Sequence, residues 1–230
     1  MALQGQAPSR SAYNIMYQMD ARRFDPIDRL IGEIDKVIKT LSVPPRAARA
    51  APQVPMRAPL EEAERLESAR LMRVNHSGEV AAQALYQGQA LTARDPELKS
   101  AMHQAAAEEI DHLAWCEQRL KELKGRTSLL NPVWYFGSLA LGALAGTLGR
   151  GASLGFMAET EKQVESHLRD HLGRLSAKDL RSRAILEQMT QDEVQHGAKA
   201  ASMGGKALPI PITWAMRATS LLMTRGSYWV

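Results

Sequence analysis

The chain has one cysteine, few aromatic residues and no large excess of one charge. Cys116 alone cannot form an intrachain disulfide, which fits a reducing compartment. Aromatic residues make up 5% of the chain, whereas Ala, Leu, Met, Glu, Gln and Arg recur, so we expect a mainly helical protein. Lys and Arg alternate with Asp and Glu, which excludes a basic patch for nucleic acid. The net charge of +4 is compatible with docking on an anionic membrane surface.

Two further absences narrow the classes of function. Residues 1–19 contain no apolar h-region, so we expect no secretory signal peptide. The chain has no Gly-x-Gly-x-x-Gly turn of the kind that holds a dinucleotide. With 230 residues, 45% of them hydrophobic, the chain can bury one sizeable core.

The first 59 residues differ in character from the rest. Apolar residues at helical spacing predict a helix over residues 26–41. Five prolines within residues 42–59 then indicate an extended linker. We therefore expect residues 1–59 to form an N-terminal helix and a Pro-rich linker, and residues 60–230 to form the main domain.

Four long helices are predicted in the main domain. The first three cover about residues 60–91, 96–125 and 153–173. The fourth begins at a capping signature, Ser176-x-x-Asp179, and ends at Gly204. Between the second and third lies the most hydrophobic segment, residues 131–149, in which four glycines weaken an ordinary soluble helix. We expect it to pack on the bundle and touch lipid rather than span a membrane. The aromatic and basic tail after Ile210 suggests an interfacial amphipathic helix.

Two Glu-x-x-His motifs carry the clearest chemical signal. Glu109 and His112, and again Glu193 and His196, lie three residues apart, so each pair projects from one face of a helix. A carboxylate beside an imidazole suits iron or manganese. One such pair alone is more often part of an exposed helix surface, but two pairs in matched surroundings favour a metal site.

Each motif is preceded by a helix with one glutamate on an apolar face. Glu79 lies 30 residues before Glu109, and Glu161 lies 32 residues before Glu193. Two such hairpins packed face to face would bring four glutamates and two histidines together, the ligand set of a ferritin-like di-iron carboxylate protein. The hydrophobic segment supplies the long crossover of such a fold. Glu165, one turn after Glu161, competes for its role.

The segments Arg73–Glu79 and Glu109–His112, together with Glu161 and the Glu193–His196 segment, resemble the demethoxyubiquinone hydroxylase family, di-iron monooxygenases of ubiquinone biosynthesis. The resemblance runs from about Leu60 to the C-terminus, and the family often has Asp where this chain has Asn75. It implies an all-α ferritin-like bundle and two Fe(II) ions held by six residues: Glu79, Glu109, His112, Glu161, Glu193 and His196. Glu109 and Glu193 are the expected bridging carboxylates. The implied reaction is O₂-dependent hydroxylation of a polyprenyl methoxy-benzoquinol, with NADH or the quinol as reductant.

Several other side chains have open roles. Tyr86 shares a face with Glu79 and could relay electrons, contact the quinone or simply pack. His167 could support the ligands from outside, or bind zinc with His171, although no general-base glutamate stands between them. Asp111 and Asp192 could be outer carboxylate partners or exposed charges. His76 and His103 are expected at the surface or at helix ends.

Two other classes of function remain open. One is another ferritin-like iron oxidoreductase or iron-binding protein, and the other is a membrane-associated lipid- or quinone-binding protein without chemistry. Composition favours a peripheral membrane protein on the cytoplasmic face of the cell membrane, with an organellar membrane as the alternative. A homo-oligomer or a complex for quinone biosynthesis is compatible with the sequence. The sequence does not indicate the length of the substrate's prenyl chain.

Overall fold

The computed structural model describes residues 26–55 and 58–230, which form helices and no strand. The predicted lack of a signal peptide concerns residues outside these ranges. The chain divides into two compact units, residues 1–39 and 40–230. The Pro-rich segment falls within the second unit, so the expected boundary at residue 60 stays a prediction.

The N-terminal helix α2 (Pro26–Ser42) begins where its apolar periodicity predicts and ends one residue later. Its apolar stripe is exposed: Ile27, Ile31, Ile34 and Ile38 keep between 49 and 66% of their surface accessible.

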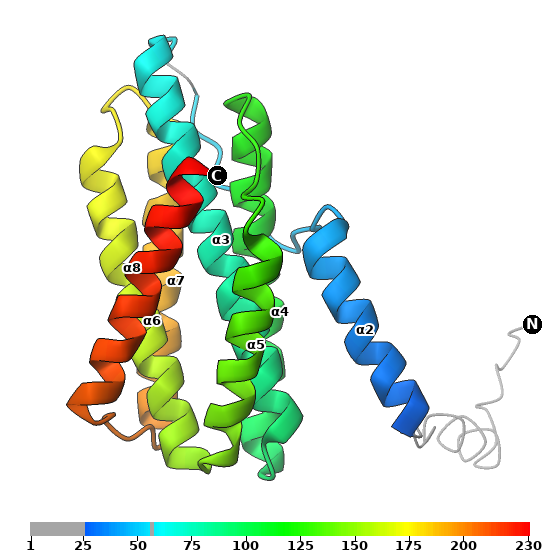
Figure 1. The fold of residues 1–230 in the computed structure, drawn as a ribbon. Coiled ribbons are helices and arrows are strands. Elements are labelled where there is room, and N and C mark those ends of the chain that lie inside the picture. The colour runs from blue at the N-terminus through cyan, green and yellow to red at the C-terminus, as the bar shows by residue number, and fades with distance from the viewer. Residues whose placement is uncertain (1–25, 56–57) are drawn as a thin grey trace, which may run out of the picture. The chain divides into compact units, whose positions relative to one another are not determined.

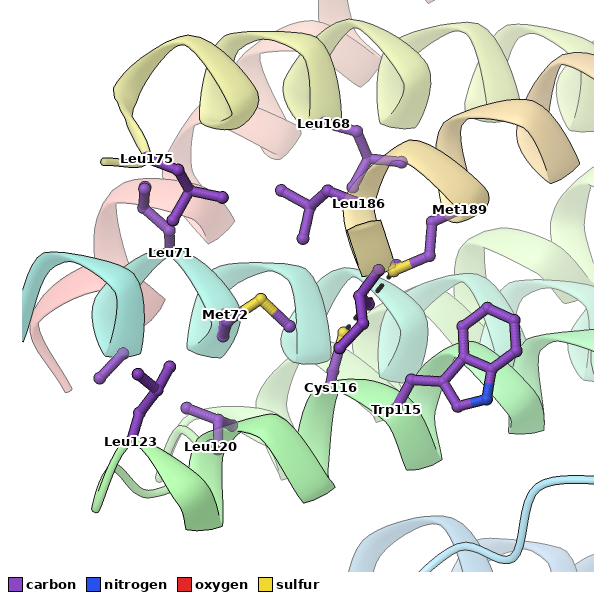
Figure 2. Close-up of a cluster of buried hydrophobic side chains, with 12 residues drawn as sticks. Leu71, Met72, Trp115, Cys116, Leu120, Leu123, Leu168, Leu175, Leu186 and Met189 are labelled. Atoms are coloured by element: carbon purple, nitrogen blue, oxygen red, sulfur yellow. Dashed lines mark hydrogen bonds between the residues drawn. The ribbon is translucent and has the colours of Figure 1, made fainter. Parts of the chain in front are cut away.

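Four helices form the core of the second unit: α3 (Glu62–Thr92), α4 (Pro96–Glu122), α6 (Arg150–Arg174) and α7 (Leu180–Ser202). Short turns join α3 to α4 and α6 to α7, which gives two antiparallel hairpins (Figure 1). All four helices contribute to one apolar cluster, in which Leu71, Cys116, Leu168 and Met189 meet (Figure 2). A second cluster includes Leu98, Met102, Leu154 and Met157. The expected all-α class is confirmed for the described residues.

Helix caps follow the sequence, with one correction. Asp95 accepts hydrogen bonds from the backbone N–H groups of Glu97 and Leu98, at 2.9 and 3.3 Å. At the start of α7 the cap is Asp179, whose carboxylate accepts from Ser182 N at 3.0 Å. The expectation that Ser176 caps this helix is wrong, because a turn separates Ser176 from the first helical residue.

The crossover segment forms helix α5 (Asn131–Thr147), which packs closely along α3. A Cβ at Gly142 would overlap the carbonyl oxygen of Leu85, and one at Gly88 would overlap that of Leu139. Only glycine permits this backbone approach. The glycines that weaken α5 as an isolated helix are thus what allow it to pack.

The other side of α5 and most of the last helix, α8 (Ile210–Trp229), carry exposed apolar side chains. On α5 these include Phe136 and Leu144, and on α8 Trp214 and Leu222, each at least half exposed. Trp134 of α5 donates to Ser227 Oγ of α8 at 3.0 Å, and both helices lie on one side of the bundle (Figure 1). Among the described helices, none combines the length and apolarity needed to cross a membrane.

Candidate metal centre

The six residues singled out by the sequence meet inside the bundle in two overlapping donor groups. One group consists of Glu79, Glu109, His112 and Glu193, and the other of Glu109, Glu161, Glu193 and His196. Within each group, one ligand atom per residue lies within 4.8 Å of all the others. Glu109 and Glu193 belong to both groups, as expected of carboxylates that bridge two ions.

Each imidazole of the cluster turns one nitrogen inward and the other toward an outer carboxylate. His112 Nδ1 lies 3.1 Å from Glu109 Oε2 and 3.2 Å from Glu193 Oε1, while its Nε2 lies 3.0 Å from Asp192 Oδ2. His196 Nδ1 lies 3.5 Å from Glu109 Oε1, and its Nε2 lies 2.9 Å from Glu108 Oε2. A carboxylate behind an imidazole fixes the tautomer and orients the ring of a metal ligand.

Burial and mutual interaction shift the pKa values of the cluster. Desolvation raises the pKa of Glu79 and of Glu161. Desolvation also disfavours ionised Glu109, but its interactions with His112 and His196 outweigh this effect and leave the pKa of Glu109 below its ordinary value. Burial opposes protonation of His196 too, yet its contacts with Glu109 and Glu193 raise its pKa to about 10. The cluster therefore holds several charges that lack solvent and that attract cations.

Buried atoms without hydrogen bonds test whether a metal fits here. Among the described residues, Glu109 Oε1, Glu161 Oε2, Glu193 Oε1 and His196 Nδ1 are buried and make no hydrogen bond. Leaving such atoms unpaired is costly, and a cation would pair all of them. Carboxylate oxygens with imidazole nitrogens suit Fe(II) or Mn(II). The donor set therefore fits two such ions.

Comparison with known proteins agrees with this centre. The family model for "Ubiquinone biosynthesis protein COQ7" matches residues 66–227. The chain belongs to this family. A protein of Bordetella parapertussis named 3-demethoxyubiquinol 3-hydroxylase is 55% identical over 211 residues, which cover 91% of this chain and 95% of that protein. Proteins with the same name from Nitrosomonas europaea and Ralstonia pickettii are 54 and 52% identical; the matches cover 89 and 88% of this chain and 99% of each relative.

A solved structure confirms the ferritin-like fold of this COQ7-family chain. The bacterioferritin-related protein of Bacteroides fragilis, described as a dodecameric thioferritin, superposes with a TM-score of 0.51. The match covers 63% of this chain and 86% of that protein, at 16% sequence identity. At that identity the likeness concerns the fold alone.

Glu161 and Glu165, which compete in the sequence, lie in different surroundings. Glu161 is 1% exposed and lies in the second donor group, where it accepts a hydrogen bond from Tyr86 OH. Glu165 instead pairs with Arg169 at 2.8 Å on the outside of α6. Tyr86 is itself fully buried, and burial together with the charge of Glu161 raises its pKa. Tyr86 therefore holds a position from which it can orient Glu161.

The remaining histidines have contacts away from the donor groups. His167 Nδ1 lies 3.5 Å from Ser220 Oγ, so its contact is with α8 rather than with a ligand. His171 is buried and its Nδ1 lies 2.7 Å from Asn75 Oδ1. His76 is 4% exposed and lies 3.3 Å from Asn131, so its expected surface position is wrong. The close packing of α5 on α3, which helical spacing does not reveal, covers His76.

An apolar cavity of about 240 Å³ reaches the donor groups from the side of α5 and α8. Helices α3, α5, α6 and α8 line it, with Glu79 at the ligand end and Leu85, Trp134, Phe156 and Met216 among its apolar walls. The lining also includes polar side chains, among them Asn75 and His167. The cavity joins exposed apolar helices to one edge of the candidate metal centre.

Sequence reasoning missed one outer partner and left another open. Glu108 contacts His196 from across the bundle, and no spacing within one helix indicates that contact. Asp192, which the sequence left between an outer partner and an exposed charge, is 7% exposed and contacts His112. Asp111 lies one step further out and pairs with Arg49.

Proposed function

We propose that this chain is a di-iron monooxygenase that hydroxylates the ring of demethoxyubiquinol, a polyprenyl methoxy-benzoquinol, with O₂ as co-substrate. The single observation that carries the proposal is the pair of buried donor groups that share Glu109 and Glu193 in a member of the COQ7 family. Relatives at 52 to 55% identity are named for this hydroxylation. Their alignments cover nearly the whole of each relative, which supports transfer of the activity.

In this proposal Glu79 and His112 would hold one iron, Glu161 and His196 would hold the other, and Glu109 and Glu193 could serve both. When bound, iron supplies the redox chemistry that activates O₂. The four glutamates, which are almost completely buried, would balance the charge of two Fe(II) ions. Asp192 and Glu108 keep the inward nitrogen of each histidine free for its ion. Tyr86 orients Glu161 through its hydroxyl group.

The cavity beside Glu79 gives the quinol ring a place next to the iron ligands. Its apolar walls exclude water and fit a ring that carries a greasy tail. The prenyl chain would leave between α5 and α8, where exposed Phe136, Leu144, Trp214 and Leu222 offer a lipid-like path. Among the polar lining residues, Asn75 and His167 are candidates for hydrogen bonds to the ring oxygens.

Exposed apolar side chains on α5 and α8, together with a net charge of +4, support peripheral attachment to an anionic membrane surface. For this protein we propose the cytoplasmic face of the cell membrane. A quinol substrate dissolved in the bilayer would enter the cavity from that side without crossing water. Homo-oligomerisation and a complex with other enzymes of quinone biosynthesis are compatible with this arrangement.

The proposal is tested by anaerobic purification, iron quantification and quinone analysis after addition of O₂ and a reductant. Two irons per chain and a hydroxylated quinol are expected, and separate reactions with NADH and with excess quinol identify the electron donor. Iron without hydroxylation would indicate another ferritin-like iron protein. A chain that retains quinol but takes up no iron would indicate a lipid-binding protein, and both outcomes would overturn the proposal.

A further inference from the structure

Arg49, in the Pro-rich segment that precedes the bundle, contacts two aspartates next to the candidate metal ligands. Arg49 Nε lies 2.7 Å from Asp111 Oδ2, and Arg49 Nη2 lies 2.8 Å from Asp192 Oδ2. Asp111 immediately precedes His112, and Asp192 immediately precedes Glu193. One guanidinium therefore joins the two helices that carry the Glu-x-x-His motifs.

Several other contacts fix Arg49 in this position. The backbone N–H groups of Ala48 and Arg49 donate to Asp111 Oδ1 at 2.6 and 3.3 Å. Trp115 Nε1 donates to Arg49 O at 2.9 Å, and the guanidinium carbon lies 5.0 Å from the centre of the Trp115 ring. Backbone and side chain are both held, although half of the side-chain surface stays accessible. This geometry is specific, unlike an ordinary exposed ion pair.

Arg49 and the candidate ligand His112 both contact the same oxygen atom of Asp192. Asp192 Oδ2 lies 2.8 Å from Arg49 Nη2 and 3.0 Å from His112 Nε2, while Asp192 Oδ1 accepts from Gln188 at 3.0 Å. The orientation of Asp192 and the electron density at Oδ2 depend on the cation that shares that oxygen. Both properties act on the imidazole of His112, because an outer carboxylate sets the direction and the donor strength of a ligating ring.

We infer that Arg49 is a positioning residue, which acts through Asp192 to set the orientation and donor strength of His112 toward the ion at the Glu79 and His112 group. It also neutralises Asp111 and Asp192, two buried carboxylates beyond the four glutamates that hold the ions. Arg49 lies before residues 66–227, the part of the chain that the family model covers. The inference rests on the proposed di-metal function.

The test uses the full-length metal-free protein and Co(II), whose absorption spectrum reports ligand geometry without turnover. Arg49→Ala is expected to weaken Co(II) binding about tenfold or more at one of two sites and to change its absorption band, because outer partners of ligands typically contribute 10- to 100-fold in affinity. Arg49→Lys keeps the charge but lacks the planar fork, and is expected to recover only part of the affinity. Arg46→Ala is the matched control, since Arg46 is an exposed arginine of the same segment.

A second pair of variants separates positioning from simple support of the fold. Asp192→Asn is expected to weaken the same site, and Arg49→Ala in the Asp192→Asn background is expected to add little. If Arg49 only holds the segment in place, Arg49→Ala will lower the unfolding temperature but leave Co(II) affinity and spectrum as in Arg46→Ala, which overturns the inference. Fully additive losses with Asp192→Asn would also overturn it. If the unaltered protein binds no Co(II) at all, the di-metal function itself fails.

Discussion

Glu109 and Glu193 differ from the other candidate ligands because each belongs to both donor groups. The family resemblance implies this pairing, because it makes Glu109 and Glu193 the expected bridging carboxylates. The sequence could not predict the outer partners Glu108 and Arg49, whose contacts with His196 and Asp192 come from other parts of the chain. Periodicity reports which side chains share a helix face, and a contact between helices needs the three-dimensional packing.

Tyr86 offers a test at the second donor group. Tyr86→Phe removes the hydroxyl that donates to Glu161, so metal affinity at the Glu161 and His196 group should fall up to about tenfold. Stability should fall by only about 1 kcal/mol, the usual value of one hydrogen bond. Metal titration and urea unfolding measure the two effects. Tyr135→Phe is the control, because Tyr135 is equally buried but donates to Gln87; equal metal affinity in both variants would refute a role for Tyr86.

Two buried histidines make the metal-free protein sensitive to mild acid. Burial lowers the pKa of His76 and of His171 to about 4. The unfolded chain, with ordinary values near 6.5, therefore binds protons first, and stability is lost as pH falls from about 6.5 toward about 4. Each histidine should account for about 2 kcal/mol of unfolding free energy between pH 7 and pH 5.

Urea unfolding at these two pH values measures the loss in the unaltered protein and in His76→Gln and His171→Gln. The raised pKa values of Glu79 and Glu161 increase stability as pH falls, which opposes the effect of the histidines. This contribution is the same in the unaltered protein and in both variants. Each replacement should reduce the pH dependence of the unfolding free energy, because it removes one histidine whose pKa burial lowers. An unchanged pH dependence in both buried-site variants would show that these histidines do not titrate as described.

At the scale of elements, apolar periodicity and capping residues predict the helices to within a few residues. The exception is the start of α7, where Asp179 rather than Ser176 is the cap. The packing of α5 is harder to predict, because glycine reads as a weak helix former and its use in a close backbone contact is visible only with the partner helix present.

Gly142→Ala should therefore be destabilising, by about 1–3 kcal/mol, since the new methyl group meets the backbone of Leu85 and a backbone cannot move aside cheaply. Gly137→Ala in the same helix is the control, because a Cβ there has no neighbour within 4 Å. It should stabilise the protein by about 0.5–1 kcal/mol through helix propensity. Denaturant unfolding of both variants decides the matter, and similar effects of the two would contradict close packing of α3 and α5.

On the scale of the whole molecule, helices α5 and α8 carry exposed apolar side chains and also line the cavity beside Glu79. The sequence alone does not reveal this connection between the surface and the site. The cavity is lined by four helices that are distant in sequence, and two of its polar residues, Asn75 and His167, come from different helices. The sequence indicates that residues 131–149 and the tail are lipid-like. It does not indicate that both border one entrance.

Membrane attachment can be measured with anionic vesicles. Replacing Leu144, Trp214 and Leu222 together by serine should weaken vesicle binding at least tenfold, since burial of one large apolar side chain is worth about 1.5–3 kcal/mol. Serine at Leu66 and Leu91, exposed leucines of α3, should leave binding unchanged. Co-sedimentation in which the triple variant binds as well as the control would rule out this face as the membrane contact.

The most direct test of the shared di-metal centre is anaerobic Fe(II) titration of the unaltered protein and three variants. Two ions per chain are expected for the unaltered protein and for Glu165→Ala, whose side chain pairs with Arg169 outside the centre. Glu79→Ala should keep one ion, because Glu79 belongs to one donor group, and Glu193→Ala should lose both. One ion per chain in Glu193→Ala, the same as in Glu79→Ala, would contradict a centre in which Glu193 serves both metals.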